Sequence, residues 1–112
     1  AGEGEFHVQF SAPEQLITQP DDVISPLGDV YALGAVLYAL LCGHTPFRGR
    51  NERELVAKIV SGQHPPLDVY NALLPSKMVE MIDKAMEVDP KRRYADMGQF
   101  RAAILEALKT AG

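Results

Sequence analysis

The sequence predicts an all-α fold with about four main helices, one short helix and no sheet. In several stretches apolar residues recur at intervals of three and four, and prolines and glycines separate these stretches. Only residues 6–10 alternate apolar and polar side chains as a strand would. With 112 residues, 46% of them apolar and 23% charged, the chain has the size and composition of one globular domain.

The N-terminal segment, residues 1–9, is expected to be flexible or extended, because it is rich in Gly and Glu. Residues 10–112 form the predicted helical domain. Proline is tolerated in the first turn of a helix, so Pro13 favours a short helix at residues 14–18. Residues 19–25 contain Pro and two Asp residues and are expected to form a loop.

The longest predicted helix begins at Ser25-Pro26, where a capping hydroxyl precedes a proline suited to the first helical position. It is expected to run to about Leu41 and to stop at Gly43. Because it is apolar on nearly every side, it should be surrounded by protein. Gly34 inside it would permit close approach of another backbone.

Three further helices follow from capping patterns and apolar stripes. Asn51 with Glu54 resembles a capping box for a helix at residues 52–61, which Gly62 would end. A long connection over residues 64–75 should precede a helix at residues 77–87, capped by Ser76. Asp96 with Gln99 would cap the last helix, residues 97–109. The expected inward side chains are Leu55, Val56, Ile59 and Val60, then Met78, Ile82, Ala85 and Met86, then Met97, Phe100, Ile104 and Leu108.

Composition excludes several classes of function. A net charge of -4 and a pI near 5.3 argue against a nucleic-acid partner. The longest apolar stretch, residues 30–43, is too short for a membrane span. The single cysteine, Cys42, permits no internal disulfide and fits a reducing, cytoplasmic location. His7, His44 and His64 have no metal-ligand spacing, and no serine lies in a Gly-x-Ser-x-Gly elbow. No catalytic, metal-binding or cofactor-binding residue is therefore predicted.

Three short strings share the order and spacing of one family. They are Ala12-Pro13-Glu14, Asp29-Val30-Tyr31-Ala32-Leu33-Gly34 and Asp89-Pro90-Lys91-Arg92-Arg93. Together they resemble the later part of the C-lobe of a eukaryotic-type serine/threonine protein kinase, from the end of the activation segment to the last helix. The ending Arg-Arg-Tyr-Ala is most similar to bacterial members. The chain contains no Gly-rich phosphate loop, Val-Ala-Ile-Lys strand, His-Arg-Asp loop or Asp-Phe-Gly motif.

The resemblance implies a buried structural ion pair between Glu14 and Arg93; the alternative is that both are solvated surface residues. It also implies that Asp29 anchors the catalytic loop, although an ordinary acidic residue in a first helical turn is an equal alternative. Phe6-His7 stands where the family carries Gly-Thr, which places substrate recognition in doubt. The residues that match the family's structural motifs are Ala12, Pro13, Asp29, Gly34, Asp89 and Pro90.

The resemblance implies a C-lobe fragment that is inactive alone, from a parent that transfers phosphate from ATP to Ser or Thr of proteins. ATP and Mg²⁺ are then expected only in a complete parent. The alternatives are a stand-alone C-lobe module that binds proteins, and an unrelated helical interaction domain. The missing kinase elements should leave an apolar surface that self-association or a protein partner covers. The residues predicted for this surface are Tyr31, Tyr38, Leu41, Leu55 and Ile59.

Overall fold

The computed structural model describes residues 10–17, 26–62 and 64–111, and within them it contains helices and no strand. The predicted all-α class is confirmed for this part of the chain. The elements are α2 (Pro13–Ile17), α3 (Pro26–Cys42), α4 (Glu52–Ser61), α5 (Leu67–Tyr70), α6 (Ser76–Ala85), a short 3-10 turn η2 (Pro90–Arg92) and α7 (Met97–Ala111). The predicted N-terminal segment, the loop at residues 19–25 and the Ser25 cap lie outside the described residues.

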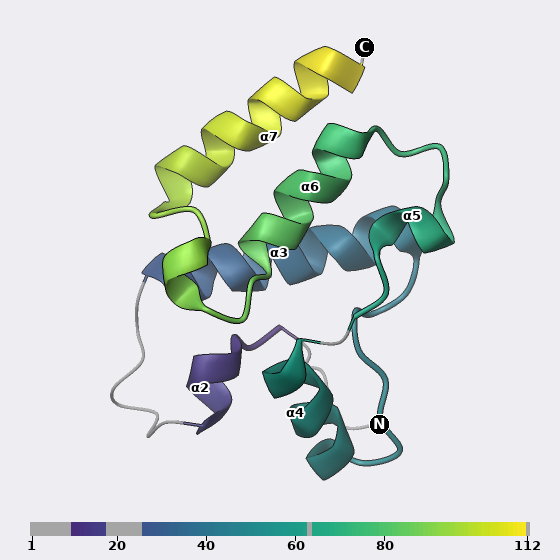
Figure 1. Ribbon diagram of the computed structural model, residues 1–112, viewed down its shortest axis with the longest axis vertical. Coiled ribbons are helices and arrows are strands. Elements are labelled where there is room, and N and C mark those ends of the chain that lie inside the picture. Colours follow the sequence, from purple (N-terminus) through teal and green to yellow (C-terminus); the bar gives the residue numbers. More distant parts are fainter. Residues whose placement is uncertain (1–9, 18–25, 63, 112) are drawn as a thin grey trace.

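Helix α3 crosses the middle of the molecule, with α6 and α7 on one side of it and α2 and α4 on the other (Figure 1). Val30, Tyr31, Ala35 and Tyr38 of α3 are buried, so the long helix supplies the centre of the core. Gly43 follows α3 with φ +78°, a left-handed conformation that glycine adopts without steric cost. The predicted stop at this glycine is confirmed.

Gly34 lies at a close approach of α3 to the end of α6. A Cβ atom built on Gly34 would lie 2.8 Å from Cβ of Ala85 and 3.2 Å from Cγ of Met86. Any larger side chain would push the two helices apart, which explains the glycine in an otherwise strong helix.

Helix α4 begins and ends as predicted. The backbone N–H of Glu54 donates to Oδ1 of Asn51 over 2.9 Å, and Gly62 closes the helix with φ +72°. Leu55 and Ile59 are buried. Val56 and Val60 are only half-buried, so the inward stripe is narrower than predicted.

The boundaries of α6 differ from the prediction. The helix begins at Ser76 and ends at Ala85, and Pro75 is the N-cap, with no side-chain hydrogen bond. Ser76 is thus the first helical residue and not the cap, because the fixed φ of proline already sets the entry angle. The connection before α6 also contains the short helix α5, which the prolines around it concealed in the sequence. Ile82, Ala85 and Met86 are buried as predicted, while Met81 is buried as well and Met78 only half-buried.

The predicted inward face of α7 is half right: Phe100 and Ile104 pack in or against the core, but Met97 and Leu108 do not. Phe100 is buried, but Met97 is 38% exposed and Leu108 is 55% exposed. Ala107 is buried instead and Ala103 packs against the core, because small residues let α7 lie close to α6. Helix α7 therefore also carries apolar residues outside the core, Met97 and Leu108, while Ile104 is half-buried and packs against the core.

Candidate functional site: a buried arginine anchor and an apolar outer face

Arg93 follows η2, and its side chain is 0% exposed. Its guanidinium donates to the carboxylate of Glu14 twice, from Nη1 to Oε2 over 2.6 Å and from Nη2 to Oε1 over 2.8 Å. This two-pronged geometry uses the planar fork that distinguishes arginine from lysine. The structure thus joins two residues that lie 79 positions apart in the chain.

The remaining hydrogens of the Arg93 guanidinium reach three backbone carbonyl groups. Nε donates to the oxygen of Glu87 over 2.7 Å, Nη1 to that of Leu27 over 3.0 Å, and Nη2 to that of Val88 over 3.3 Å. The guanidinium also lies over the ring of Tyr31, 4.9 Å from its centroid. One side chain therefore fastens α2, the first turn of α3 and the connection after α6 to one another.

The electrostatics of this anchor favour the ion pair. Burial opposes ionisation of Glu14, but the hydrogen bonds from Arg93 and from the backbone, together with the Arg93 charge, outweigh it. The pKa of Glu14 therefore lies below its ordinary value. The same surroundings raise the pKa of Tyr31, mainly through burial and against the opposing effect of the Arg93 charge. Tyr31 is consequently a neutral packing partner and not a titrating group.

The other motif residues have structural positions. Ala12 and Pro13 are buried beside Glu14. Oδ1 of Asp89 accepts the backbone N–H of Lys91 over 3.0 Å, and Pro90 opens η2. Asp29 is exposed in the first turn of α3, where negative charge is favourable.

The predicted partner surface is wrong in most of its members. Tyr31, Tyr38, Leu55 and Ile59 are at most 4% exposed, so they cannot contact a partner without unfolding. The Tyr38 hydroxyl donates to the carbonyl oxygen of Pro65, and desolvation raises the pKa of Tyr38. Leu41 is half-buried. The sequence indicated an apolar helix but not which of its sides the chain itself would cover.

Other apolar residues of α3 and α7 remain exposed or half-buried, and we call them the outer face: exposed Leu40, Met97 and Leu108 with half-buried Leu33, Leu37 and Ile104. The three α3 residues are spaced by four and three, so they lie on one side of that helix. Leu40 is 75% exposed. A hollow of about 470 Å³ lies between the helices and is lined by Leu33, Met97, Gly98, Arg101 and Ile104. Helix α7 carries apolar residues on more than one side, and this pattern in the sequence could have predicted that some of them lie outside the core.

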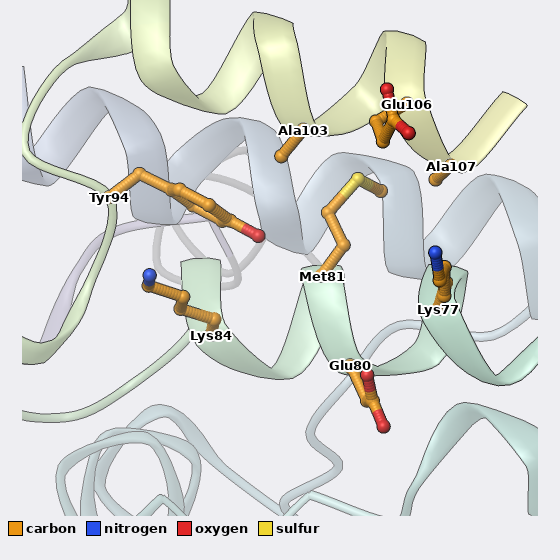
Figure 2. Close-up of a pocket in the computed structure, with 8 residues that line it drawn as sticks. All are labelled: Lys77, Glu80, Met81, Lys84, Tyr94, Ala103, Glu106 and Ala107. Carbon is orange, nitrogen blue, oxygen red and sulfur yellow. The ribbon is translucent and has the colours of Figure 1, made fainter. Parts of the chain in front are cut away.

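A second groove, of about 320 Å³, lies between α6 and α7 (Figure 2). Lys84 lies over the ring of Tyr94 with Nζ 4.5 Å from the centroid, and Tyr94 stacks on Phe100 at 5.2 Å. Met81 points from α6 toward α7 between Lys77 and Lys84 (Figure 2). Desolvation raises the pKa of Tyr94. Met81, Ala103 and Ala107 line the groove between the two helices, and Lys84 contacts Tyr94 in the connection before α7; the groove shows no nucleophile paired with a base.

In residues 10–17, 26–62 and 64–111, no three His, Cys, Asp or Glu side chains come together in a way that could hold a metal ion. Within the same ranges, none of the helices combines the length and apolar character required to cross a bilayer.

Comparison with known proteins gives one consistent family. The protein kinase domain model matches residues 5–107. A calcium/calmodulin-dependent protein kinase type II of Schizosaccharomyces pombe is 33% identical over 93 residues, which cover 83% of this chain and 18% of the relative. The serine/threonine-protein kinase Pkn1 of Myxococcus xanthus is 36% identical over 104 residues, which cover 89% of this chain and 14% of the relative. The serine/threonine-protein kinase PrkC of Bacillus subtilis is 31% identical over 100 residues, which cover 89% of this chain and 15% of the relative. The chain therefore spans less than a fifth of the length of these three relatives.

Proposed function

This chain belongs to the protein kinase domain family, and from that membership we propose that it is the scaffold part of a serine/threonine kinase C-lobe, inactive alone. The parent would transfer phosphate from ATP to Ser or Thr of proteins. The residues that hold ATP and Mg²⁺ would then lie in the parent outside this chain. Family membership leaves no room for an unrelated helical interaction domain.

The observation that carries the proposal is the Arg93 anchor. Catalysis of phosphoryl transfer depends almost entirely on positioning and on electrostatic stabilisation of the reacting groups. Segments that position substrate must therefore be held on a rigid base. Through two bonds to Glu14 and three to carbonyl groups, Arg93 fixes α2 against α3 and the connection after α6. The Ala12-Pro13-Glu14 segment therefore has a defined place even without the catalytic residues.

A chimera tests the proposal. Residues 10–111 would replace the matching segment in the Pkn1 protein of Myxococcus xanthus, whose sequence is 36% identical over 104 residues. We expect the chimera to autophosphorylate, and the isolated chain to show neither phosphate transfer nor a rise in Tm with ATP and magnesium. Arg93→Ala in the chimera should remove activity, while Lys91→Ala should retain it.

Two results would contradict the scaffold role. One is a chimera that is folded by circular dichroism but inactive, and the other is an isolated chain whose Tm rises with ATP and magnesium. The first would mean that this scaffold cannot support the chemistry. The second would mean that a nucleotide site is formed within the chain itself.

The outer face supports a second candidate function, protein binding by the C-lobe alone. Leu40 is 75% exposed and lies on the same side of α3 as the half-buried Leu33 and Leu37, and contiguous exposed apolar surface is typical of an interface. In a complete kinase domain the remaining part of the C-lobe would cover it, and in isolation we expect self-association. Sedimentation equilibrium should show a dimer that Leu40→Ser weakens. Leu73→Ser serves as the control, because it changes a leucine that is 93% exposed on the connection between α5 and α6. A monomer at every concentration would contradict this candidate.

A further inference from the structure

The α3 side of the outer face begins with a carboxylate. Asp29 precedes Leu33, Leu37 and Leu40 at successive spacings of four, four and three, which places all four residues on one side of the helix. Asp29 is exposed and is the only charged residue of α3. It takes part in none of the ion pairs that the described residues form. One end of this apolar stripe therefore carries an unpaired negative charge.

The α7 side of the outer face contains a guanidinium. Arg101 lies between Met97 and Ile104 at spacings of four and three, so it occupies a position within the apolar stripe. The other charged residues of α7, Glu106 and Lys109, fall outside this spacing. Arg101 is exposed, and within the part of the chain that the structure describes it forms no ion pair. Each stripe thus contains one charge, and the two charges are opposite in sign.

Both charges lie beside the hollow of the outer face. Arg101 lines this hollow together with Leu33, and Asp29 lies one helical turn before Leu33 on the same side of α3. A charge that is covered and loses water needs an opposite charge or hydrogen bonds to offset the cost. A protein that covers this face must therefore present a cation to Asp29 and an anion to Arg101.

We propose that the partner is a second copy of this chain, related by a two-fold axis, with Asp29 of each copy paired with Arg101 of the other. In a two-fold interface the same patch meets itself, so each contact between two different residues occurs twice. A patch with one acid and one base among apolar residues is complementary to itself under this symmetry. The inference rests on the self-association proposed for the outer face and specifies the charge pairs that orient the two copies.

Sedimentation equilibrium of two charge-reversal variants tests this pairing. In a dimer of Asp29→Arg both contacts join two cations, and in a dimer of Arg101→Glu both contacts join two carboxylates. We expect the dimer Kd of each variant alone to rise about tenfold or more, because like charges then meet twice in the interface. In an equimolar mixture, a dimer with one copy of each variant joins opposite charges at both contacts. The mixture should therefore dimerise about as tightly as the parent chain.

Lys109→Glu is the matched control for Arg101→Glu. It makes the same change of charge on α7 at a position outside the apolar stripe, so the dimer Kd should stay within about threefold of the parent value. Asp29 and Arg101 are exposed, so their variants should fold, and circular dichroism verifies this. Should Asp29→Arg not fold, the comparison of Arg101→Glu with Lys109→Glu still decides.

The possible failures are distinguishable. Equal effects of Arg101→Glu and Lys109→Glu, or a mixture that dimerises no more tightly than the separate variants, would overturn the pairing and leave self-association standing. A parent chain that stays monomeric at every concentration would overturn self-association itself. A dimer that each reversal weakens and the mixture restores supports the two-fold arrangement, because only contacts between copies are repaired by mixing.

Discussion

Replacing Arg93 with alanine should be the most damaging single substitution at the anchor. The Arg93 side chain is 0% exposed and that of Glu14 is 20% exposed, so the carboxylate left behind would be only partly hydrated. Removing one partner of a buried ion pair costs about 3–5 kcal/mol. The oxygens of Leu27, Glu87 and Val88 would also lose their donor. Since domains of this size are stable by about 5–15 kcal/mol, the variant should approach the unfolding threshold.

Urea denaturation and thermal melting would measure this effect. We expect a loss of about 3–5 kcal/mol and a fall in Tm of more than about 10 °C. Lys91→Ala changes an exposed cation two positions away in η2 and should stay within about 0.5 kcal/mol of the parent chain. Arg93→Lys keeps the charge without the fork, so its stability should fall between those of the alanine variant and the parent chain.

A double-mutant cycle separates the pair from simple loss of packing. If Glu14 and Arg93 stabilise each other, removing both should cost clearly less than the sum of the single losses. Additivity within about 0.5 kcal/mol, or equal effects of Arg93→Ala and Lys91→Ala, would refute the reasoning. Because Arg93→Ala could fail to fold, the cycle can also be closed with Arg93→Lys and Glu14→Gln.

Two further predictions follow from the packing and from the ionisation of the anchor. Gly34→Ala should destabilise the fold by about 1–3 kcal/mol in urea, because its Cβ would lie 2.8 Å from Cβ of Ala85. Gly98→Ala in α7, whose Cβ would meet only Oδ1 of Asp96 at 3.2 Å, should be neutral or slightly stabilising, and an equal loss at both glycines would contradict the packing argument. Acid should destabilise the chain: the lowered pKa of Glu14 contributes stability that is present above its ordinary value of 4.5 and is lost as the pH falls through the folded-state value. Glu14→Gln should therefore lose less stability between about pH 6 and pH 3 than the parent chain, and an equal loss would argue against the ion pair.

Asp83 should oppose Glu14 in this pH dependence. Its pKa is raised, so protonation of Asp83 stabilises the folded chain as the pH falls. The Asp83→Asn variant removes this contribution and should lose more stability in acid than the parent chain does. Comparison of the two variants by urea denaturation therefore separates the contribution of Glu14 from that of Asp83.

Local signals in the sequence were sufficient for most helix boundaries. Asn51 and Asp96 accept the backbone N–H of Glu54 and Gln99, as the capping patterns predicted, and Gly43 and Gly62 adopt positive φ where the helices stop. Caps and glycine stops involve residues only a few positions apart, so the local sequence is enough to predict where these helices begin and end. The entry to α6 was less clear, because Pro75 replaces a side-chain cap.

Burial was harder to predict than helix position. An unbroken apolar helix gives no indication of which side the chain will cover, so Tyr31 and Tyr38 were wrongly placed on a partner surface. Asp83 carried a signal that was overlooked: it lies four residues after Val79 and three before Met86, within an apolar stripe. A carboxylate at that spacing is a candidate for burial, and Oδ1 of Asp83 is indeed buried.

The sequence by itself determined the helices, their caps and the family, since local propensity and three motif strings are properties of neighbouring residues. Tertiary structure alone decided that α7 turns Ala107 inward and leaves Met97 and Leu108 outside. The Glu14–Arg93 pair was already implied by the resemblance, but the three further bonds of Arg93 to backbone carbonyl groups and the burial of Oδ1 of Asp83 without a donor among the described residues were not. These outcomes depend on how helices distant in the chain pack against one another, and periodicity within one helix does not contain that information.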